Sequence, residues 1–113
     1  MGQGWLKHVE ITARAEKDLR QLDKPTRARV VEGLLADLVP TPAPGNIDVK
    51  LLRGAEPWMR LRIGAYRILF RAMSAEELAP LVADLPKADR PGEGYLVERI
   101  VHRRDLDRAV GTL

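Results

Sequence analysis

The sequence predicts an α+β domain in which an N-terminal strand and a helical hairpin pack on one face of a small twisted sheet. Three observations carry this prediction: helical periodicity early in the chain, strand patterns in its middle, and a final strand followed by a short C-terminal helix. Helices followed by a run of strands are typical of an antiparallel sheet with its helices on one side. We therefore expect a sheet that is antiparallel, mixed at most, within a single domain over residues 1–113.

The start of the chain predicts a strand and a helix. Trp5 to Thr12 carries apolar residues at strand spacing, and Thr12 is a suitable helix N-cap. Residues 13–22 predict the first helix, whose exposed side carries two i,i+4 charge pairs, Arg14/Asp18 and Glu16/Arg20.

A second helix follows almost at once. Proline is tolerated in a first helical turn, so Asp23-Lys24-Pro25 ends the first helix and begins the next, which runs to about Leu38. Helical spacing predicts a shared apolar side made of Val31, Leu34, Leu35 and Leu38. Residues 40–46 (PTPAPGN) then predict a stiff connector.

The middle of the chain predicts three strands. The first covers Ile47 to Arg53, and residues 54–57 turn it into a hairpin over Trp58 to Arg71. Gly64-Ala65 fits a two-residue type II′ turn, which takes glycine at its first position. This turn places two pairs of residues opposite each other, Ile63 with Tyr66 and Arg62 with Arg67.

Alternation gives this hairpin two chemically different faces. One face is apolar and consists of Met59, Leu61, Ile63, Tyr66, Ile68 and Phe70. The other face is mainly cationic and consists of Trp58, Arg60, Arg62, Arg67, Leu69 and Arg71. Because Leu69 lies on this second face, we expect the C-terminal segment to cover part of it. The rest of this face is expected to be open.

The cationic face indicates a binding site for an anion. Like charges opposite each other destabilise a sheet, yet Arg62 faces Arg67, and no Asp or Glu occurs from Pro57 to Ala75. Lys50 and Arg53 add cations just before the hairpin. A solvated sheet face is one interpretation. Four arginines on one face favour the other, an anion site for a phosphate backbone or an acidic partner.

The chain after Phe70 predicts an insertion, a strand and a helix. The insertion covers about 74–94: Ser74 to Glu77 fits a capping box, Pro80 breaks the helix that follows, and residues 87–94 form a mobile loop. The last strand is expected over Tyr95 to His102, and a short helix over 103–110.

Composition excludes several classes of site. The chain has no cysteine, which excludes disulfides and thiolate metal sites, and its two histidines are far apart in sequence, so we expect no metal and no cofactor. The net charge of +3 does not by itself indicate a nucleic-acid-binding protein. No segment has the apolar length of a membrane span or the pattern of a signal peptide, so we expect a cytoplasmic protein without a membrane partner.

Three motifs together resemble the RelE/ParE superfamily, the toxins of type II toxin–antitoxin modules. They are a strand with a helical hairpin, LLRG followed by WMRLRIGAYRILF, and IVHRRD near the C-terminus. The resemblance implies a RelE-like fold with the 74–94 segment as an insertion. It also implies one of two activities: RelE-like members cut mRNA on the ribosome, whereas ParE-like members inhibit DNA gyrase and are not nucleases. A third possibility is a non-catalytic RNA- or partner-binding module. A small, acidic cognate antitoxin is the implied partner.

The resemblance also implies roles for particular residues. Arg62 and Arg67 match basic residues of the RelE catalytic surface, Arg103 matches an arginine after the last strand, and Arg60 matches a further cationic position. Histidine titrates near neutral pH, so His102 is expected to act as general base or acid, or else to be structural. The expected RNA-binding residues are Lys50, Arg53, Arg60 and Arg71. Asp107 stands where many ribonuclease members have a catalytic tyrosine, which leaves cleavage open.

Overall fold

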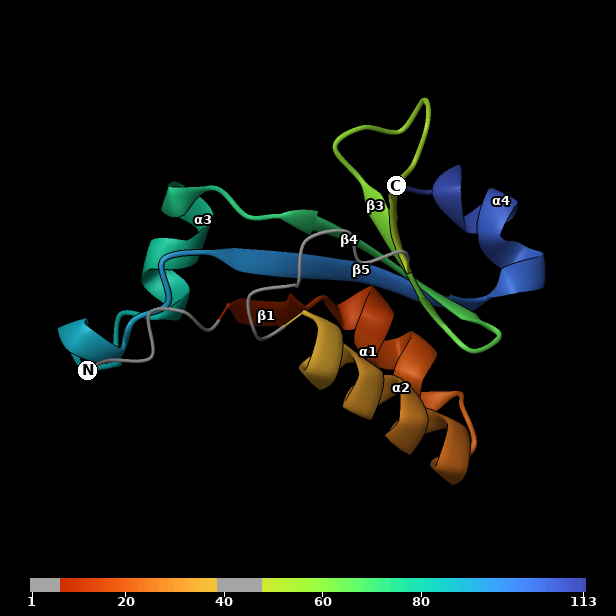
Figure 1. Cartoon of the computed structure of the whole chain (residues 1–113), viewed down its shortest axis with the longest axis horizontal. Coiled ribbons are helices and arrows are strands. Elements are labelled where there is room, and N and C mark those ends of the chain that lie inside the picture. Colours follow the sequence, from red (N-terminus) through yellow and green to blue (C-terminus); the bar gives the residue numbers. More distant parts are fainter. Residues whose placement is uncertain (1–6, 39–47) are drawn as a thin grey trace.

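The computed structural model describes residues 7–38 and 48–113, which form five strands, four α-helices and three short 3₁₀ turns (Figure 1). The strands are β1 (His8–Ile11), β2 (Val49–Leu51), β3 (Met59–Ile63), β4 (Tyr66–Ala72) and β5 (Gly94–His102). The α-helices are α1 (Ala13–Arg20), α2 (Lys24–Asp37), α3 (Ala75–Leu78) and α4 (Leu106–Val110). The 3₁₀ turns are η1 (Ala79–Leu81), η2 (Lys87–Asp89) and η3 (Arg103–Asp105). The predicted connector over 40–46, and Trp5, Leu6 and Ile47, lie outside the described residues.

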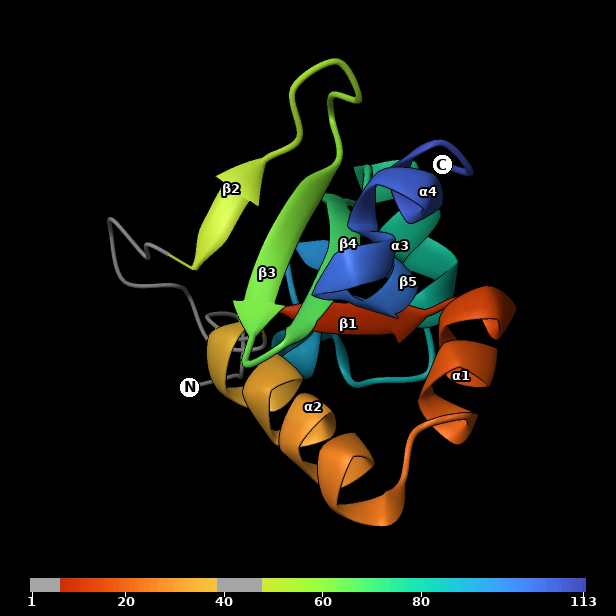
Figure 2. The same cartoon turned by 90° about the vertical axis from the view of Figure 1, so that its right-hand side faces the viewer.

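The strands form one mixed sheet in the order β1-β5-β4-β3-β2. β1 pairs with β5 in parallel, and the other three pairings are antiparallel. The α+β fold and the mixed sheet are therefore as predicted. Figure 2 shows α1 and α2 on one side of the sheet and α4 on the other.

The central hairpin has the predicted register. Ile63 pairs with Tyr66 and Arg62 pairs with Arg67. Gly64 has a positive φ of 58°, and no other residue type has a positive φ in the described chain, which fits glycine at the first position of a type II′ turn. This turn fixes which side chains share a face, and so it places the arginines together.

The apolar face of the hairpin packs against α1 and α2, as predicted. Leu61, Ile68 and Phe70 are buried in the main core, and the buried side of α2 consists of Val30, Leu34 and Leu38. The prediction was wrong for Val31 and Leu35, which are 37% and 59% exposed. The spacing of four residues fits both Val30–Leu34–Leu38 and Val31–Leu35, so the pattern alone did not choose between the two sides.

A second, smaller core lies on the cationic face of the sheet. Leu69 is fully buried there with Leu52, Val101 and Ala109, and the side chains of α4 pack around them. The expected cover from the C-terminal segment is confirmed. The cationic face is therefore divided: α4 covers its centre, and the arginines flank that cover.

The cap of α1 was predicted correctly, but one of its two charge pairs was not. Thr12 accepts a hydrogen bond from the Ala15 amide at 3.2 Å, and Glu16 pairs with Arg20 at 3.7 Å. Asp18 does not pair with Arg14. Its Oδ2 accepts from Arg99 Nε at 2.8 Å and from the Ile100 amide at 2.9 Å, so it joins α1 to β5.

The segment over 74–94, which the resemblance implied to be an insertion, forms a lobe at the end of the molecule opposite the β3–β4 turn and α4 (Figure 1). The predicted capping box between Ser74 and Glu77 is present, and the helix ends at Leu78, where η1 with Pro80 begins. The loop expected over 87–94 contains η2, and the Arg90 side chain donates to two main-chain carbonyls there, of Leu85 and Ala83. Within the described residues, no helix has the length and apolar character needed to cross a bilayer.

Candidate functional site

The cationic side chains of β2, β3 and β4 line a groove of about 390 Å³, which we call the arginine groove. Its walls are Val49, Lys50, Arg60, Arg62 and Arg67. Lys50 pairs with Arg60 across β2 and β3, and Arg62 pairs with Arg67 across β3 and β4, so the sheet register brings the four cations together. Apart from Val49, every described residue that lines the groove carries a positive charge.

Arg67 is held at the end of the hairpin by main-chain acceptors. Its Nη1 donates to the Gly64 carbonyl at 3.0 Å and to the Tyr66 carbonyl at 2.9 Å, and it forms no ion pair with a described carboxylate. Burial lowers the pKa of Arg67, and the neighbouring charges of Arg60, Arg62 and Arg103 lower it further. The positive charges of these three guanidinium groups therefore act against that of Arg67, and the described residues of the groove carry an excess of positive charge.

Two of the four hairpin arginines are paired with carboxylates, which the sequence analysis did not foresee. Arg62 donates to Asp48 Oδ1 from Nη2 at 2.8 Å and from Nε at 3.1 Å. Arg71 binds both oxygens of Glu77, at 2.9 and 2.7 Å. Glu77 lies shortly after the acid-free stretch from Pro57 to Ala75 and Asp48 well before it, so a count of charges within that stretch missed both.

Arg71 is separated from the arginine groove. Its guanidinium lies 5.6 Å from the centre of the Trp58 ring, and the hydrogen bonds to Glu77 raise the pKa of Arg71. Glu77 also accepts the Ser74 amide in the capping box, so Arg71 joins β4 to the insertion. Trp58, which is half-buried beneath Arg71, packs against the second core.

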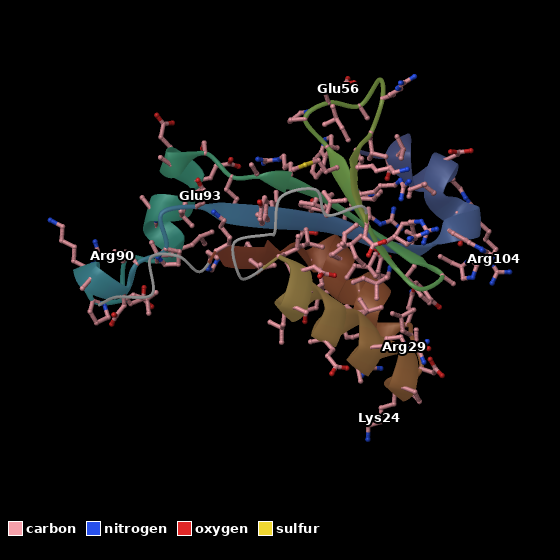
Figure 3. All side chains as sticks on the ribbon, in the orientation of Figure 1. Lys24, Arg29, Glu56, Arg90, Glu93 and Arg104 are labelled. Atoms are coloured by element: carbon pink, nitrogen blue, oxygen red, sulfur yellow. The ribbon has the colours of Figure 1, made fainter. Side chains whose placement is uncertain are left out.

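Arg103 and Arg104 are exposed at the start of η3, beside the β3–β4 turn. The Arg103 amide donates to the Ala65 carbonyl at 2.8 Å, which fixes the position of η3 against the hairpin. Among the described residues neither guanidinium has a carboxylate partner, because Asp105 pairs with Arg108 at 2.7 Å. Arg104 points away from the body of the molecule in Figure 3. Arg53 is exposed in the β2–β3 turn and does not line the groove.

His102 lies on the other face of the sheet from the groove. It pairs with Tyr66, and the two rings meet edge to face at 5.5 Å between centroids, on the side that carries the main core. Its Nδ1 accepts a hydrogen bond from the Arg104 amide at 3.2 Å and so caps η3. The ring also lines a separate hollow of about 410 Å³ between α1 and α4. A neutral ring that accepts through Nδ1 carries its proton on Nε2.

The remaining residue types do not form a metal site. No group of three or more potential ligands occurs among residues 7–38 and 48–113. Asp107, at the position where the sequence analysis expected a tyrosine in related ribonucleases, is exposed on α4. The groove thus offers positive charge and hydrogen-bond donors, and the chemistry it can supply is the binding of an anion and the stabilisation of charge on it.

Comparisons with known proteins agree with this fold and identify a family. The family model described as the ParE toxin of the type II toxin–antitoxin system, parDE, matches residues 9–106. Among curated proteins no significant match was found.

Two solved structures are similar in fold. The toxin–antitoxin complex RelBE2 from Mycobacterium tuberculosis has 24% identity and a TM-score of 0.53, over 87% of this chain and 99% of that chain. The RelB–RelE antitoxin–toxin complex from Methanococcus jannaschii has 16% identity and a TM-score of 0.51, over 88% and 96% of the two chains. On the family match and this common fold, the chain belongs to the ParE toxin family of type II toxin–antitoxin systems, within the RelE/ParE superfamily.

Proposed function

We propose that this toxin acts in the cytoplasm as a metal-independent endoribonuclease that cuts mRNA on the ribosome. The observation that supports the proposal is the convergence of Arg60, Arg62 and Arg67 on one groove, with Arg103 close enough to affect the pKa of Arg67. A phosphodiester is the anion that such a set of guanidinium groups fits, because each presents a planar fork of donors. Lys50, at the outer end of the groove, extends the contact to a neighbouring phosphate.

The proposed reaction uses a nucleophile that the RNA itself supplies. The ribose 2′-oxygen attacks the adjacent phosphorus as its proton passes to solvent water, and the bond from phosphorus to the 5′-oxygen breaks as that oxygen takes up a proton from solvent. The products are a 2′,3′-cyclic phosphate and a 5′-hydroxyl. Negative charge increases on the phosphate oxygens in the transition state, and Arg67 and Arg62 are the groups proposed to stabilise it. Arg103 contributes from the side of η3.

His102 enters this proposal as a positioning residue. Its ring faces away from the groove, and its Nδ1 caps the turn in which Arg103 and Arg104 lie. By capping η3, it fixes the start of the segment that carries Arg103.

Inhibition of DNA gyrase without chemistry is the second candidate. The matching family model is the one described as the ParE toxin, and two features of the site also favour this candidate. Among the described residues that line the groove there is no general base of ordinary strength, because apart from Val49 all are Lys or Arg. The exposed Asp107 in place of a tyrosine points the same way. A gyrase inhibitor would need only the binding surface.

The test uses Arg67→Ala and a matched control, Arg90→Ala. Both arginines donate to two main-chain carbonyls, but Arg90 lies in the insertion at the opposite end of the molecule (Figure 3). In a translation extract, wild-type protein and Arg90→Ala should cut mRNA, and Arg67→Ala should lose about 10²-fold or more. RNA ends are mapped by primer extension, and gyrase supercoiling is measured in parallel. Normal cutting by folded Arg67→Ala would refute the mechanism, and loss of supercoiling without RNA cutting would favour the second candidate.

An acidic antitoxin is the proposed partner. Both similar structures are complexes of a toxin with its antitoxin. The arginine groove presents a concentrated positive charge, which favours an anionic segment over a neutral one. An acidic peptide in this groove would exclude the phosphate backbone of RNA.

A further inference from the structure

Asp48 forms an ion pair with Arg62 that an incoming phosphate can displace. Both donors on one side of the guanidinium, Nε and Nη2, reach the same oxygen, Oδ1. A strong fork pairs two donors with two oxygens, so this contact is not the best that the guanidinium can form. Both side chains are open to solvent, at 51% exposure for Arg62 and 38% for Asp48.

A phosphate can offer two oxygens to the same two donors. The Arg62 amide also donates to the Asp48 carbonyl at 2.9 Å, so the backbone holds Asp48 beside Arg62 whether or not their side chains are paired. Asp48 precedes Val49 and Lys50, which line the groove, and the pairing of β2 with β3 places Asp48 beside Arg62, which also lines it.

We propose that Asp48 is an internal competitor for Arg62 and sets the affinity of the arginine groove for phosphate. Without an anion, its carboxylate neutralises Arg62 and limits the repulsion between Arg62 and Arg67, which lie opposite each other. When a phosphate binds, Arg62 exchanges the carboxylate for phosphate oxygens. The inference rests on the proposed function, because it takes the groove to be a phosphate site.

The expected gain on removing this competitor is small and measurable. An exposed ion pair of this kind changes an equilibrium by about fivefold at most. Asp48→Asn should therefore bind single-stranded RNA up to about fivefold more tightly. One more unneutralised cation should also make the salt dependence steeper, by about 0.7 in the slope of log K against log salt concentration.

The experiment measures the anisotropy of a labelled single-stranded RNA ten-mer with wild type, Asp48→Asn, Arg62→Ala and the double variant. Asp84→Asn is the matched control, because it makes the same change of charge at an exposed site in the insertion. We expect Asp48→Asn to gain more affinity than Asp84→Asn, and we expect that gain to be lost in the Arg62→Ala background. Circular dichroism verifies that each variant is folded.

The other outcomes separate the two proposals. Two results would overturn the role of Asp48 and leave the proposed function standing. In the first, wild type binds RNA but Asp48→Asn gains no more affinity than the Asp84→Asn control. In the second, Asp48→Asn gains the same affinity in the Arg62→Ala background. If Asp48→Asn gains the expected RNA affinity but no RNA is cut, the role of Asp48 is supported and the proposed nuclease activity is contradicted. No RNA binding by wild type or Asp48→Asn would overturn both.

Discussion

Leu69→Ala tests the second core beneath α4. Leu69 is fully buried among Leu52, Val101 and Ala109, and a buried Leu→Ala change costs 2–5 kcal/mol in typical proteins. The short helix α4, Leu106–Val110, packs on this cluster together with Ala55, Trp58 and Leu113, and a short helix can settle into part of the cavity. We therefore expect a loss of about 3 kcal/mol in the free energy of unfolding, toward the lower half of that range.

The matched control is Leu35→Ala, the same change on the exposed side of α2. Leu35 is 59% exposed, so its truncation should cost under about 1 kcal/mol. Urea unfolding followed by circular dichroism gives both values, with an unchanged m value as the check that the denatured state is the same. Equal costs for the two variants, or a larger cost for Leu35→Ala, would refute the assignment of α4 as the cover of a second core.

Two further predictions concern the capping groups. The hydrogen bonds from Arg71 and Ser74 lower the pKa of Glu77 from 4.5 to about 2, so its stabilising effect is complete above pH 4.5 and is lost as the pH falls toward 2. Thermal unfolding should show Glu77→Gln less stable than wild type at pH 7, with the difference shrinking below pH 4.5; a constant difference would contradict the link. His102→Ala should lose about 1 kcal/mol and lower RNA cutting through the misplaced Arg103, whereas His102→Asn, whose side chain can still accept the Arg104 amide, should restore both. An equal loss of cutting in the two histidine variants would mean that the imidazole itself takes part.

Local rules predicted the hairpin because its determinants are local. Gly64 fixes the turn, and strict alternation then assigns every side chain from Met59 to Phe70 to a face. The capping box at Ser74 and the N-cap at Thr12 were predicted for the same reason. In each case, the residues that determine the structure lie within a few positions of one another.

The errors concern contacts between distant segments. Asp18 pairs with Arg99 across α1 and β5, a contact that no spacing rule anticipates. The exposure of Leu35 depends on which side of α2 meets the sheet. At Gly33 the helix backbone lies close to β3, because a Cβ there would be 2.7 Å from Ile63 Cδ1. Gly33, which lies between the two possible apolar sides of α2, was the sequence feature that could have indicated the side facing the sheet.

The sequence predicted which arginines share the cationic face, but not which of them form ion pairs with carboxylates. Arg60, Arg62 and Arg67 share a groove because sheet register is readable from sequence. Arg71 is on the same face of the sheet, but its contacts with Glu77 and Trp58 hold its guanidinium outside the groove. Asp48 lies before β2, outside the acid-free stretch from Pro57 to Ala75. The pairing of β2 with β3 brings it to Arg62.

The position of β5 determines when the protein can become active. This strand comes last in the chain but lies between β1 and β4, and His8 pairs with Gly94. Pairings between such distant residues form only after the intervening chain has been made. A growing chain that stops before residues 94–102 has a first strand without its partner and a hairpin without its neighbour, and it does not yet contain Arg103. Toxicity is therefore expected to begin only after the last strand has left the ribosome, which gives a newly made inhibitor time to meet its target.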